Sequence, residues 1–398
     1  MKHKEPVWLM ILRIVLAIVF LFSGFSKAID LTAASIQFDD YFISFGMGFL
    51  HPISMFCAFA MTTLEFMLGF TMLFKLKIKL TALGYMLIMI FMFFLTMWLA
   101  LAEHLETNYG YHFGVVKDCG CFGEVIKMSN LQTFLKNVPI LIGGIIVFAK
   151  RKRIPEIKLT ELGQWIVIVI AIILLSVFQI YSYRHLPLYD TSDWKIGNNV
   201  SEIYIEQPDE KEMIFIYRNA KDSTVVNIPL NEFDAIESKI PDFYTAYEYV
   251  DRIDSVVQEG HTPKIPGFNM IDSLGSEHSF ELISVDNESK LFLLFLHDLS
   301  ETNIDGLTSD KMKQLIQKVN ENGEYFVAVT NSTQEEINEF VATHQIEFPI
   351  YCNPIDPVTG PFMTRDAIRS NPGLILIEKG IVINKWSWRD IPEYSTVK

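Results

Sequence analysis

The sequence is poor in cysteine, in charge and in net positive charge. Its 398 residues include 4 cysteines, and 20% of the residues are charged while 50% are hydrophobic. So few cysteines exclude a small domain stapled by disulfides, and the charged fraction lies below the roughly 25% that is usual for soluble domains. The formal net charge of −14 argues against a nucleic-acid-binding protein, because such a protein needs a basic surface.

These averages combine two regions of different composition. Residues 1–183 carry 15 Lys and Arg against 11 Asp and Glu, a net charge of +4. Residues 184–398 carry 18 against 36, a net charge of −18. The first region also contains nearly all of the long apolar runs. This asymmetry predicts that the two regions lie in different environments.

Five apolar windows in the first region approach or exceed the roughly 20 residues that a helix needs to cross a lipid bilayer. They are Pro6–Ala28, Ile53–Phe74, Leu80–Leu101, Leu131–Phe148 and Trp165–Tyr183. We interpret the first as a retained anchor rather than a signal peptide, because its apolar stretch is long and no small-residue cleavage site comes closely after it. The sequence therefore predicts an α-helical membrane bundle with the lipid bilayer as its surroundings.

The basic residues of the loops predict the orientation of this bundle. Lys75, Lys77 and Lys79 lie between the second and third windows, and a basic run at 150–158 lies between the fourth and fifth. By the positive-inside rule these loops and the N-terminus are cytoplasmic. Five spans then place the loop between the third and fourth windows, and all of residues 184–398, on the other side. In a bacterial inner membrane that side is the periplasm, where disulfides persist.

The loop between the third and fourth windows holds the most specific motif, Asp118-Cys119-Gly120-Cys121-Phe122-Gly123. Cys119 and Cys121 either close on each other as a strained, easily reduced disulfide, or bind a soft metal together with His104 and His112. The remaining alternative is that each cysteine pairs elsewhere or stays reduced and buried. Cys57, in the second window, is either an inert core thiol or a partner for this pair.

Two ionisable residues fall inside the predicted spans, Arg13 in the first and Glu65 in the second. Such residues are costly in a membrane and are usually functional. If the two helices are antiparallel neighbours, Arg13 and Glu65 lie within pairing distance. The two residues form either a proton or quinone-head site or a structural ion pair, with Arg13 reaching toward the interface. Lys27, at the outer end of the first span, requires no special role.

The exported region begins with a small β-rich connector over residues 184–262, in which we expect strands at 202–206 and 213–217. Residues 263–398 alternate strand and helix, which indicates an α/β layer fold. The expected elements are a buried strand Leu291–His297, a helix Ser309–Val319, a strand Tyr325–Thr330, a helix that begins at Ser332–Glu335, an extended segment Phe348–Cys352 and a hairpin within Pro372–Ile383.

The membrane region resembles the DoxX/MauE group of small membrane proteins over about residues 8–150. The resemblance rests on Arg13, on Phe22-Ser23-Gly24-Phe25-Ser26-Lys27, on Glu65 with Leu68-Gly69, and on the Cys119–Cys121 motif. It implies a four-helix bundle over residues 1–160, associated with quinone-linked redox chemistry or with disulfide maturation of exported proteins, and it carries over Cys119 and Cys121 as the site. The fifth span, residues 161–183, goes beyond that pattern and serves to export residues 184–398.

Residues 263–398 resemble the thioredoxin superfamily in the order of their elements, and Asn371-Pro372 matches the cis-proline position of that family. The position after the first core strand reads His297-Asp298-Leu299-Ser300-Glu301-Thr302-Asn303, where the family has its redox Cys-x-x-Cys. This domain therefore lacks the usual dithiol. Its single cysteine, Cys352, is interpreted as a buried thiol, the alternative being a single-cysteine relay.

Together these features predict a redox-associated membrane protein in which Cys119 and Cys121 exchange disulfides with an exported protein partner. Membrane quinone is the candidate electron acceptor, with Glu65 and Arg13 as the candidate cofactor-binding residues. The competing class is a membrane scaffold, or a carrier that binds metal through thiolates, whose thioredoxin-like domain binds a partner protein.

Overall fold

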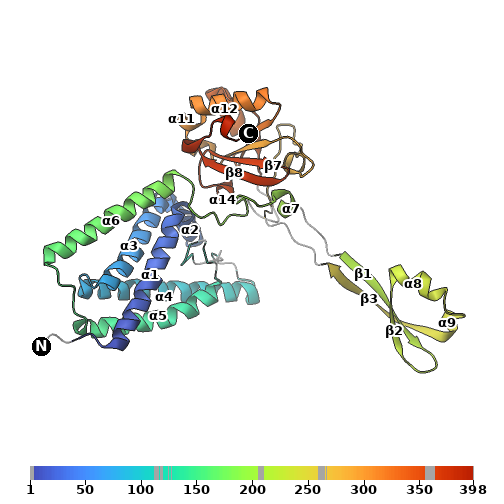
Figure 1. The fold of residues 1–398 in the computed structure, drawn as a ribbon, viewed down its shortest axis with the longest axis horizontal. Helices are drawn as coiled ribbons and strands as arrows, with labels where there is room; N and C mark the ends of the chain where they lie inside the picture. Colours follow the sequence, from blue (N-terminus) through green and yellow to red (C-terminus); the bar gives the residue numbers. More distant parts are fainter. Residues whose placement is uncertain are drawn as a thin grey trace.

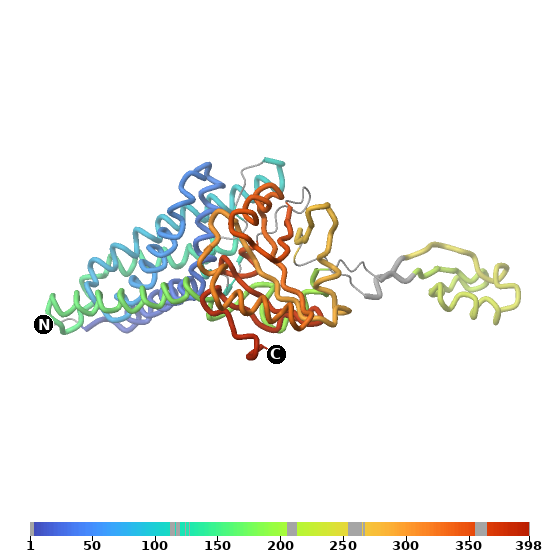
Figure 2. Tube along the Cα trace, turned by 90° about the horizontal axis from the view of Figure 1, so that it is seen from above, coloured from blue at the N-terminus to red at the C-terminus, as the bar shows by residue number. Residues whose placement is uncertain are grey.

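The computed structural model describes residues 4–111, 116, 120–123, 125–126, 128–204, 210–258, 265, 267–354 and 364–397. Figure 1 shows a helical bundle in the N-terminal part, an α/β unit at one end of that bundle, and a small β-rich arm that extends away from both. The view from above shows the same separation of the arm from the rest of the chain (Figure 2).

Among the described residues, five helices are long and apolar enough to cross a membrane, as the sequence predicts. They are α1 (Val7–Ile29), α3 (Ser54–Phe74, preceded by a 3-10 turn from Gly48), α4 (Ile78–Tyr109), α5 (Asn130–Lys150) and α6 (Glu161–Arg184). Many of their large apolar side chains are exposed, as expected of helices whose solvent is lipid rather than water.

Helices α1 and α3 pack antiparallel and in direct backbone contact. A Cβ atom on Gly24 would lie 2.5 Å from the backbone nitrogen of Phe66, and one on Gly69 would lie 2.6 Å from that of Leu21. Small residues at a membrane helix interface permit such an approach. This contact fixes the register of the two helices, with Gly24 opposite Phe66.

The connection between α1 and α3 contains an additional helix, α2 (Leu31–Ser44), which was not predicted from the sequence. Asp30 begins it: the Asp30 carboxylate accepts a hydrogen bond from the backbone N–H of Ala33 at 2.9 Å. An aspartate in this position satisfies one of the N–H groups that have no partner within the helix. Helix α2 packs on α3, so it lies at the end of the bundle where α1 ends and α3 begins.

The fifth membrane helix, α6, packs against α1 and α3. Thr63 on α3 donates a hydrogen bond to Gln179 at 3.1 Å, and Ser182 donates one to the backbone oxygen of Ile29. These polar contacts between apolar helices join α6 to the bundle.

The α/β unit contains a five-stranded sheet with the strand order β6-β5-β4-β7-β8. Its strands are β4 (Leu291–Leu296), β5 (Tyr325–Thr330), β6 (Ile350–Cys352), β7 (Gly373–Glu378) and β8 (Ile381–Ser387). The first three are parallel, and β7 and β8 are antiparallel to their neighbours. All six residues of β4 are buried, because both faces of the sheet are covered.

The predicted elements of this unit are present, with small shifts. The helices α12 (Asp310–Glu321) and α13 (Gln334–His344) come after β4 and β5, and the capping box of α13 uses Thr333 and Glu336, one residue later than expected. The Asn371–Pro372 peptide bond that precedes β7 is cis.

The arm is a three-stranded antiparallel sheet of β1 (Glu210–Asn219), β2 (Val225–Pro229) and β3 (Tyr247–Gln258), in the order β2-β1-β3. The short helices α8 (Leu230–Glu237) and α9 (Phe243–Ala246) complete it. The strand expected at 213–217 lies within β1. The strand expected at 202–206 is wrong, because residues 200–204 form the helix α7 (Val200–Tyr204).

The segment between α6 and the arm packs on the five-stranded sheet. Trp194 and Val200 are fully buried in the core on one face of that sheet. Lys385 of β8 donates hydrogen bonds to Asp190 at 2.5 Å and to the Ala367 backbone oxygen at 2.7 Å. Burial lowers the pKa of Lys385 despite its pairing with Asp190. The chain that leaves the membrane is thus fixed to the α/β unit before it enters the arm.

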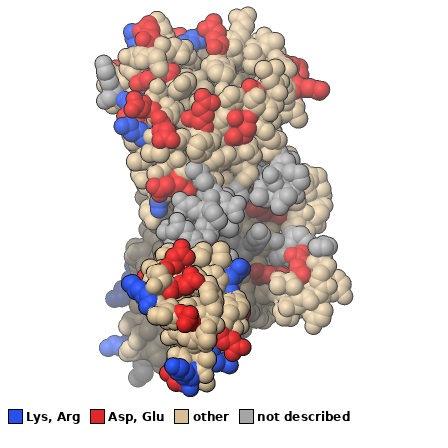
Figure 3. Space-filling view, turned by 90° about the vertical axis from the view of Figure 1, so that its right-hand side faces the viewer, with Lys and Arg blue, Asp and Glu red and all other residues tan. Residues whose placement is uncertain are grey.

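The α/β unit is also fastened to the bundle through α2. Arg369 pairs with Asp30 at 3.0 Å, and Arg365, on the short helix α14 (Thr364–Ala367), pairs with Asp39 at 3.6 Å. The upper part of Figure 3, which contains this unit, shows more Asp and Glu than Lys and Arg. The acidic excess of residues 184–398 therefore lies partly on the outside of this unit.

Candidate functional site

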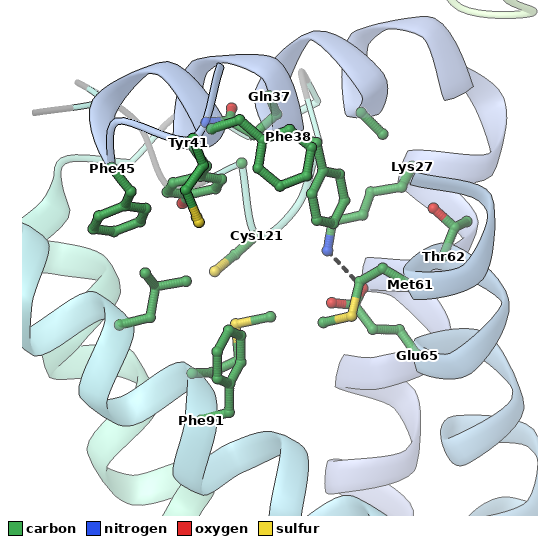
Figure 4. Close-up of a pocket in the computed structure, with 16 residues that line it drawn as sticks. Lys27, Gln37, Phe38, Tyr41, Phe45, Met61, Thr62, Glu65, Phe91 and Cys121 are labelled. Carbon is green, nitrogen blue, oxygen red and sulfur yellow. Dashed lines mark hydrogen bonds and ion pairs between the residues drawn. The ribbon is translucent and has the colours of Figure 1, made fainter. Parts of the chain in front are cut away.

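An apolar cavity of about 210 Å³ lies beneath α2, between α3 and α4. Most of its wall is aromatic or aliphatic. Its polar members are few: Lys27, Gln37, Tyr41, Thr62, Glu65 and Cys121. Figure 4 shows the sulfur of Cys121 pointing into the space between α2 and α4, and Lys27 reaching toward Glu65.

The charged part of the cavity wall is an ion pair between α1 and α3. Lys27 Nζ lies 2.6 Å from Glu65 Oε2, and the two side chains are 11% and 6% exposed. Ser23, one turn before Lys27 on the same helix face, has its hydroxyl oxygen 2.8 Å from Glu65 Oε2 and 3.2 Å from Lys27 Nζ. The three residues form one hydrogen-bonded group that is buried within the bundle.

The loop that carries Cys121 enters the bundle and contacts this group. The Ser23 hydroxyl oxygen lies 2.5 Å from the backbone oxygen of Cys121. The next residue, Phe122, packs against Phe22 with ring centroids 5.5 Å apart, and Lys136 of α5 lies 4.0 Å from the centre of the Phe122 ring. Contacts from two helices therefore hold Cys121 beside the Lys27–Glu65 pair.

Gly120 permits this path of the loop. Its φ is +61°, in the left-handed region that favours glycine. A Cβ atom there would lie 2.7 Å from the side-chain oxygen of Gln37, on α2. The loop turns back through a hydrogen bond from the Gly123 N–H to the Gly120 backbone oxygen, at 3.0 Å. The glycine between the two cysteines thus lets the loop pass directly under α2.

The predicted pairing of Arg13 with Glu65 is wrong. Arg13 is buried, but it pairs with Glu5 at 2.8 Å and donates hydrogen bonds to the backbone oxygens of Met72 and Leu73. The cause is the helix register: with Gly24 opposite Phe66, Arg13 lies opposite the far end of α3. There it satisfies carbonyl groups that have no partner within the helix. Lys27, for which no role was predicted, is the partner of Glu65.

The other predicted site residues lie in several parts of the chain. Cys119 and His112 lie outside the described residues. His104 lies on the exposed end of α4, 3.0 Å from the side chain of Asn108, and among the described residues no cluster could hold a metal ion. Cys57 is half-buried near the start of α3. Cys352 ends β6, where its Sγ lies 3.4 Å from the Ser332 backbone oxygen and burial raises the pKa of its thiol.

Sequence reasoning missed Lys27, Ser23 and helix α2. A signal for the first two is present, since Ser23 and Lys27 are four residues apart and therefore share a helix face. For α2, the signal is the apolar stripe of Ala34, Phe38, Phe42 and Phe45, which lines the cavity.

These helices and this cavity define a multi-pass membrane protein with a buried polar site near one end of its bundle. Residues 6–150 match the family described as methylamine utilisation protein MauE. The matched segment is about a third of the chain and comprises α1 to α5. No curated protein and no solved structure matches the chain. The DoxX part of the resemblance rests on the sequence motifs alone.

Proposed function

We propose that this protein is a membrane thiol-disulfide redox protein that uses Cys119 and Cys121 to oxidise or reduce an exported protein. The observation that carries the proposal is that the Cys121 side chain and the Lys27–Glu65 ion pair face the same apolar cavity. A buried ion pair offers little net stability compared with apolar side chains, and within a membrane such groups usually mark a functional site. The match of residues 6–150 to MauE supports a redox-associated role in general.

The reaction in the oxidising direction has two steps. A partner thiolate attacks the Cys119–Cys121 disulfide, and a mixed disulfide forms while one cysteine leaves as a thiolate. A second partner thiolate then attacks the partner sulfur of the mixed disulfide and releases the remaining cysteine as a thiolate. The partner gains a disulfide, and the pair becomes two thiols once both thiolates are protonated. Two electrons and two protons must then pass from the pair to an acceptor before the next cycle.

We propose membrane quinone as that acceptor, because a quinone takes up two electrons and two protons. The cavity offers apolar and aromatic side chains for a ring, among them Phe38, Phe45 and Phe91, and a cation, Lys27, for a ring carbonyl. Phe45 and Phe91 are 41% and 57% exposed. They are positioned to meet a lipid-soluble molecule that arrives from the bilayer. Of the two residues first predicted to bind the cofactor, Glu65 lines this cavity, and Arg13 is not among its lining residues.

We further propose that residues 263–398 form a thioredoxin-like domain that docks the exported partner. The support is the order of the five strands and the position of the loop 297–303. That loop comes directly after β4 and contacts the segment before β7, since the His297 N–H donates a hydrogen bond to the Asn371 side chain at 3.1 Å. Because the loop contains no cysteine, the domain binds the partner and leaves thiol exchange to the membrane pair.

The orientation is inferred from the loop charges. We propose that the N-terminus and the loops 75–79 and 150–158 face the cytoplasm of a bacterium, with the α/β unit in the periplasm. The Ile157 N–H donates a hydrogen bond to the Lys75 backbone oxygen at 3.2 Å, so the two basic loops lie at the same end of the bundle. The α/β unit is fastened to α2 at the other end.

The experiment that tests the function is a thiol-trapping assay on the full chain in lipid nanodiscs. The protein is mixed with a dithiol peptide and a short-chain quinone, and thiols are counted with a mass-tagged maleimide while quinol absorbance is monitored. We expect peptide oxidation and quinol formation in equal amounts, both lost in Cys119→Ser and Cys121→Ser. The matched controls Cys57→Ser and Cys352→Ser retain both. If Cys119 and Cys121 stay fully reduced when quinone or a stronger oxidant is present, the proposed function is wrong.

A further inference from the structure

The Ser23 hydroxyl is surrounded by more hydrogen-bond acceptors than it can donate to. Ser23 has one hydroxyl proton, yet both the Cys121 backbone oxygen, at 2.5 Å, and Glu65 Oε2, at 2.8 Å, lie within hydrogen-bond distance. Ser23 therefore links the Lys27–Glu65 pair to the backbone of Cys121.

Among the residues that the structure describes, few charged or titratable side chains share the cavity with Cys121. Lys27 comes from α1, Tyr41 from α2 and Glu65 from α3, whereas the lining residues from α4, Phe91, Met92 and Leu95, are apolar. On the side of α5, Lys136 lines a second space of about 30 Å³ together with Cys121 and Glu65. Lys136 is engaged with the ring of Phe122, so Lys27 is the cation held directly against Glu65.

A thiolate that forms in this apolar cavity needs a counter-charge. Creating an unpaired charge away from water is costly, whereas moving a proton between two groups that share one cation leaves the net charge of the site unchanged. We propose that Lys27 and Glu65 perform this function for Cys121. The Glu65 carboxylate takes the thiol proton, and the Lys27 ammonium remains as the counter-cation of whichever group is negative.

The proton transfer conserves both atoms and charge. The S–H bond of Cys121 breaks and an O–H bond forms on Glu65, while Lys27 keeps its three protons and its charge. When Cys121 later leaves its thiolate state by accepting a proton, Glu65 returns it. Ser23 is a positioning residue, since its hydroxyl holds the backbone of Cys121 beside the pair.

The test measures the alkylation rate of Cys121 by iodoacetamide against pH, in the full chain with Cys57, Cys119 and Cys352 changed to serine. Lys27→Met removes the cation, so we expect alkylation at pH 7 to fall at least tenfold, corresponding to a rise of about one unit in the pH midpoint. Glu65→Gln leaves Lys27 for the thiolate alone, so the midpoint moves to lower pH. Lys27→Arg retains the wild-type profile.

The opposite signs of these two effects separate the proposal from a purely structural role. If the pair served only to hold α1 against α3, both variants would loosen the site and shift reactivity in the same direction, and that result would overturn the proposal. An effect of Lys136→Met equal to that of Lys27→Met would also overturn it. The double variant Lys27→Met with Glu65→Gln, which lacks both charges of the pair, is expected to match Lys27→Met, and it guards against misfolding of the single variant.

This inference deepens the proposed function, but its test does not depend on turnover. The alkylation profile shifts in these directions even if no exported protein or quinone reacts with the cysteines. Conversely, disulfide exchange that proceeds unchanged in Lys27→Met, with an unshifted alkylation profile, refutes the role of Lys27 and leaves the proposed function intact.

Discussion

Arg369 and Asp30 form a buried ion pair that joins the α/β unit to the membrane bundle. Arg369 Nε lies 3.0 Å from Asp30 Oδ2, and each side chain is 11% exposed. The same aspartate begins α2 through its hydrogen bond to the Ala33 N–H. One carboxylate therefore both orders the helix that covers the Cys121 cavity and holds the α/β unit above that helix.

We expect Asp30→Asn and Arg369→Gln each to weaken this attachment. Removing one partner of a largely buried pair typically costs about 3–5 kcal/mol. Asp30→Asn is expected to cost less than Arg369→Gln, because Arg369 keeps its ion pair with Asp366 at 3.2 Å. Asparagine is as good an N-cap as aspartate, so Asp30→Asn tests the charge and leaves α2 intact. Thermal unfolding in detergent measures the effect. The double variant is expected to be no less stable than the worse single variant, because both changes remove the same interaction. Fully additive losses would show that the two residues act separately.

Gly24 is expected to be essential to the register that brings Lys27 to Glu65. In Gly24→Ala the new methyl group meets the backbone of Phe66 at 2.5–2.7 Å, and backbone cannot move aside as a flexible side chain can. Overpacking typically costs about 1–3 kcal/mol, and we expect Gly24→Ala to lose stability near the upper end of that range. The midpoint of thermal unfolding in detergent measures the loss. Gly48→Ala is the matched control, because no atom lies within 4 Å of a Cβ there. Equal stability of the two variants would contradict the close contact of α1 and α3.

The elements of the fold were predictable where hydrophobic pattern and length decide them. The five membrane helices correspond to apolar runs, and β4 corresponds to six consecutive apolar residues that are buried on both faces of a sheet. The prediction for 202–206 failed because alternation over so few residues does not distinguish a strand from a short helix that is held by tertiary contacts. The backbone N–H of Val200 bonds to the Gly380 oxygen at 2.7 Å, and this long-range contact is invisible in the local sequence.

The site was predictable in its residue types but not in its pairing. Glu65 stands out in the sequence, because a carboxylate in an apolar run is rare. Its partner depends on the relative depth of α1 and α3, which Gly24 and Gly69 set by backbone contact. Depth estimated from the window bounds favoured Arg13. The same glycines, if treated as contact points between the helices, constrain the register that brings Lys27 to Glu65.

His297 is expected to make the stability of the α/β unit depend on pH. Burial, with Arg369 and Arg365 nearby, lowers the pKa of His297 to about 3, against an ordinary value of 6.5, and its Nε2 has no hydrogen-bond partner within the described part of the chain. Between these values the unfolded chain binds a proton that the folded chain excludes. The free energy of unfolding is therefore unaffected by His297 above pH 6.5. It decreases as the pH falls from 6.5 toward 3, by about 1.4 kcal/mol per pH unit.

Unfolding midpoints between pH 7 and pH 4 measure this dependence. His297→Leu removes the titrating group, so we expect its stability to vary less with pH than that of the wild type over this range. A wild-type slope that persists unchanged in His297→Leu would assign the dependence to other groups.

Gly120 is expected to contribute to the path of the Cys121 loop in two separable ways. Gly120→Ala places a residue with a side chain at a φ of +61°, which costs roughly 1–2 kcal/mol, and it also brings the new methyl group to 2.7 Å from the Gln37 side-chain oxygen. Shortening Gln37 relieves the second effect and leaves the first. We therefore expect Gly120→Ala with Gln37→Ala to recover part of the stability that Gly120→Ala loses, whereas Gln37→Ala alone has a smaller effect. Thermal unfolding and the alkylation rate of Cys121 should report the same order of variants. Complete recovery in the double variant would show that contact with α2, rather than the backbone conformation, requires glycine between the two cysteines.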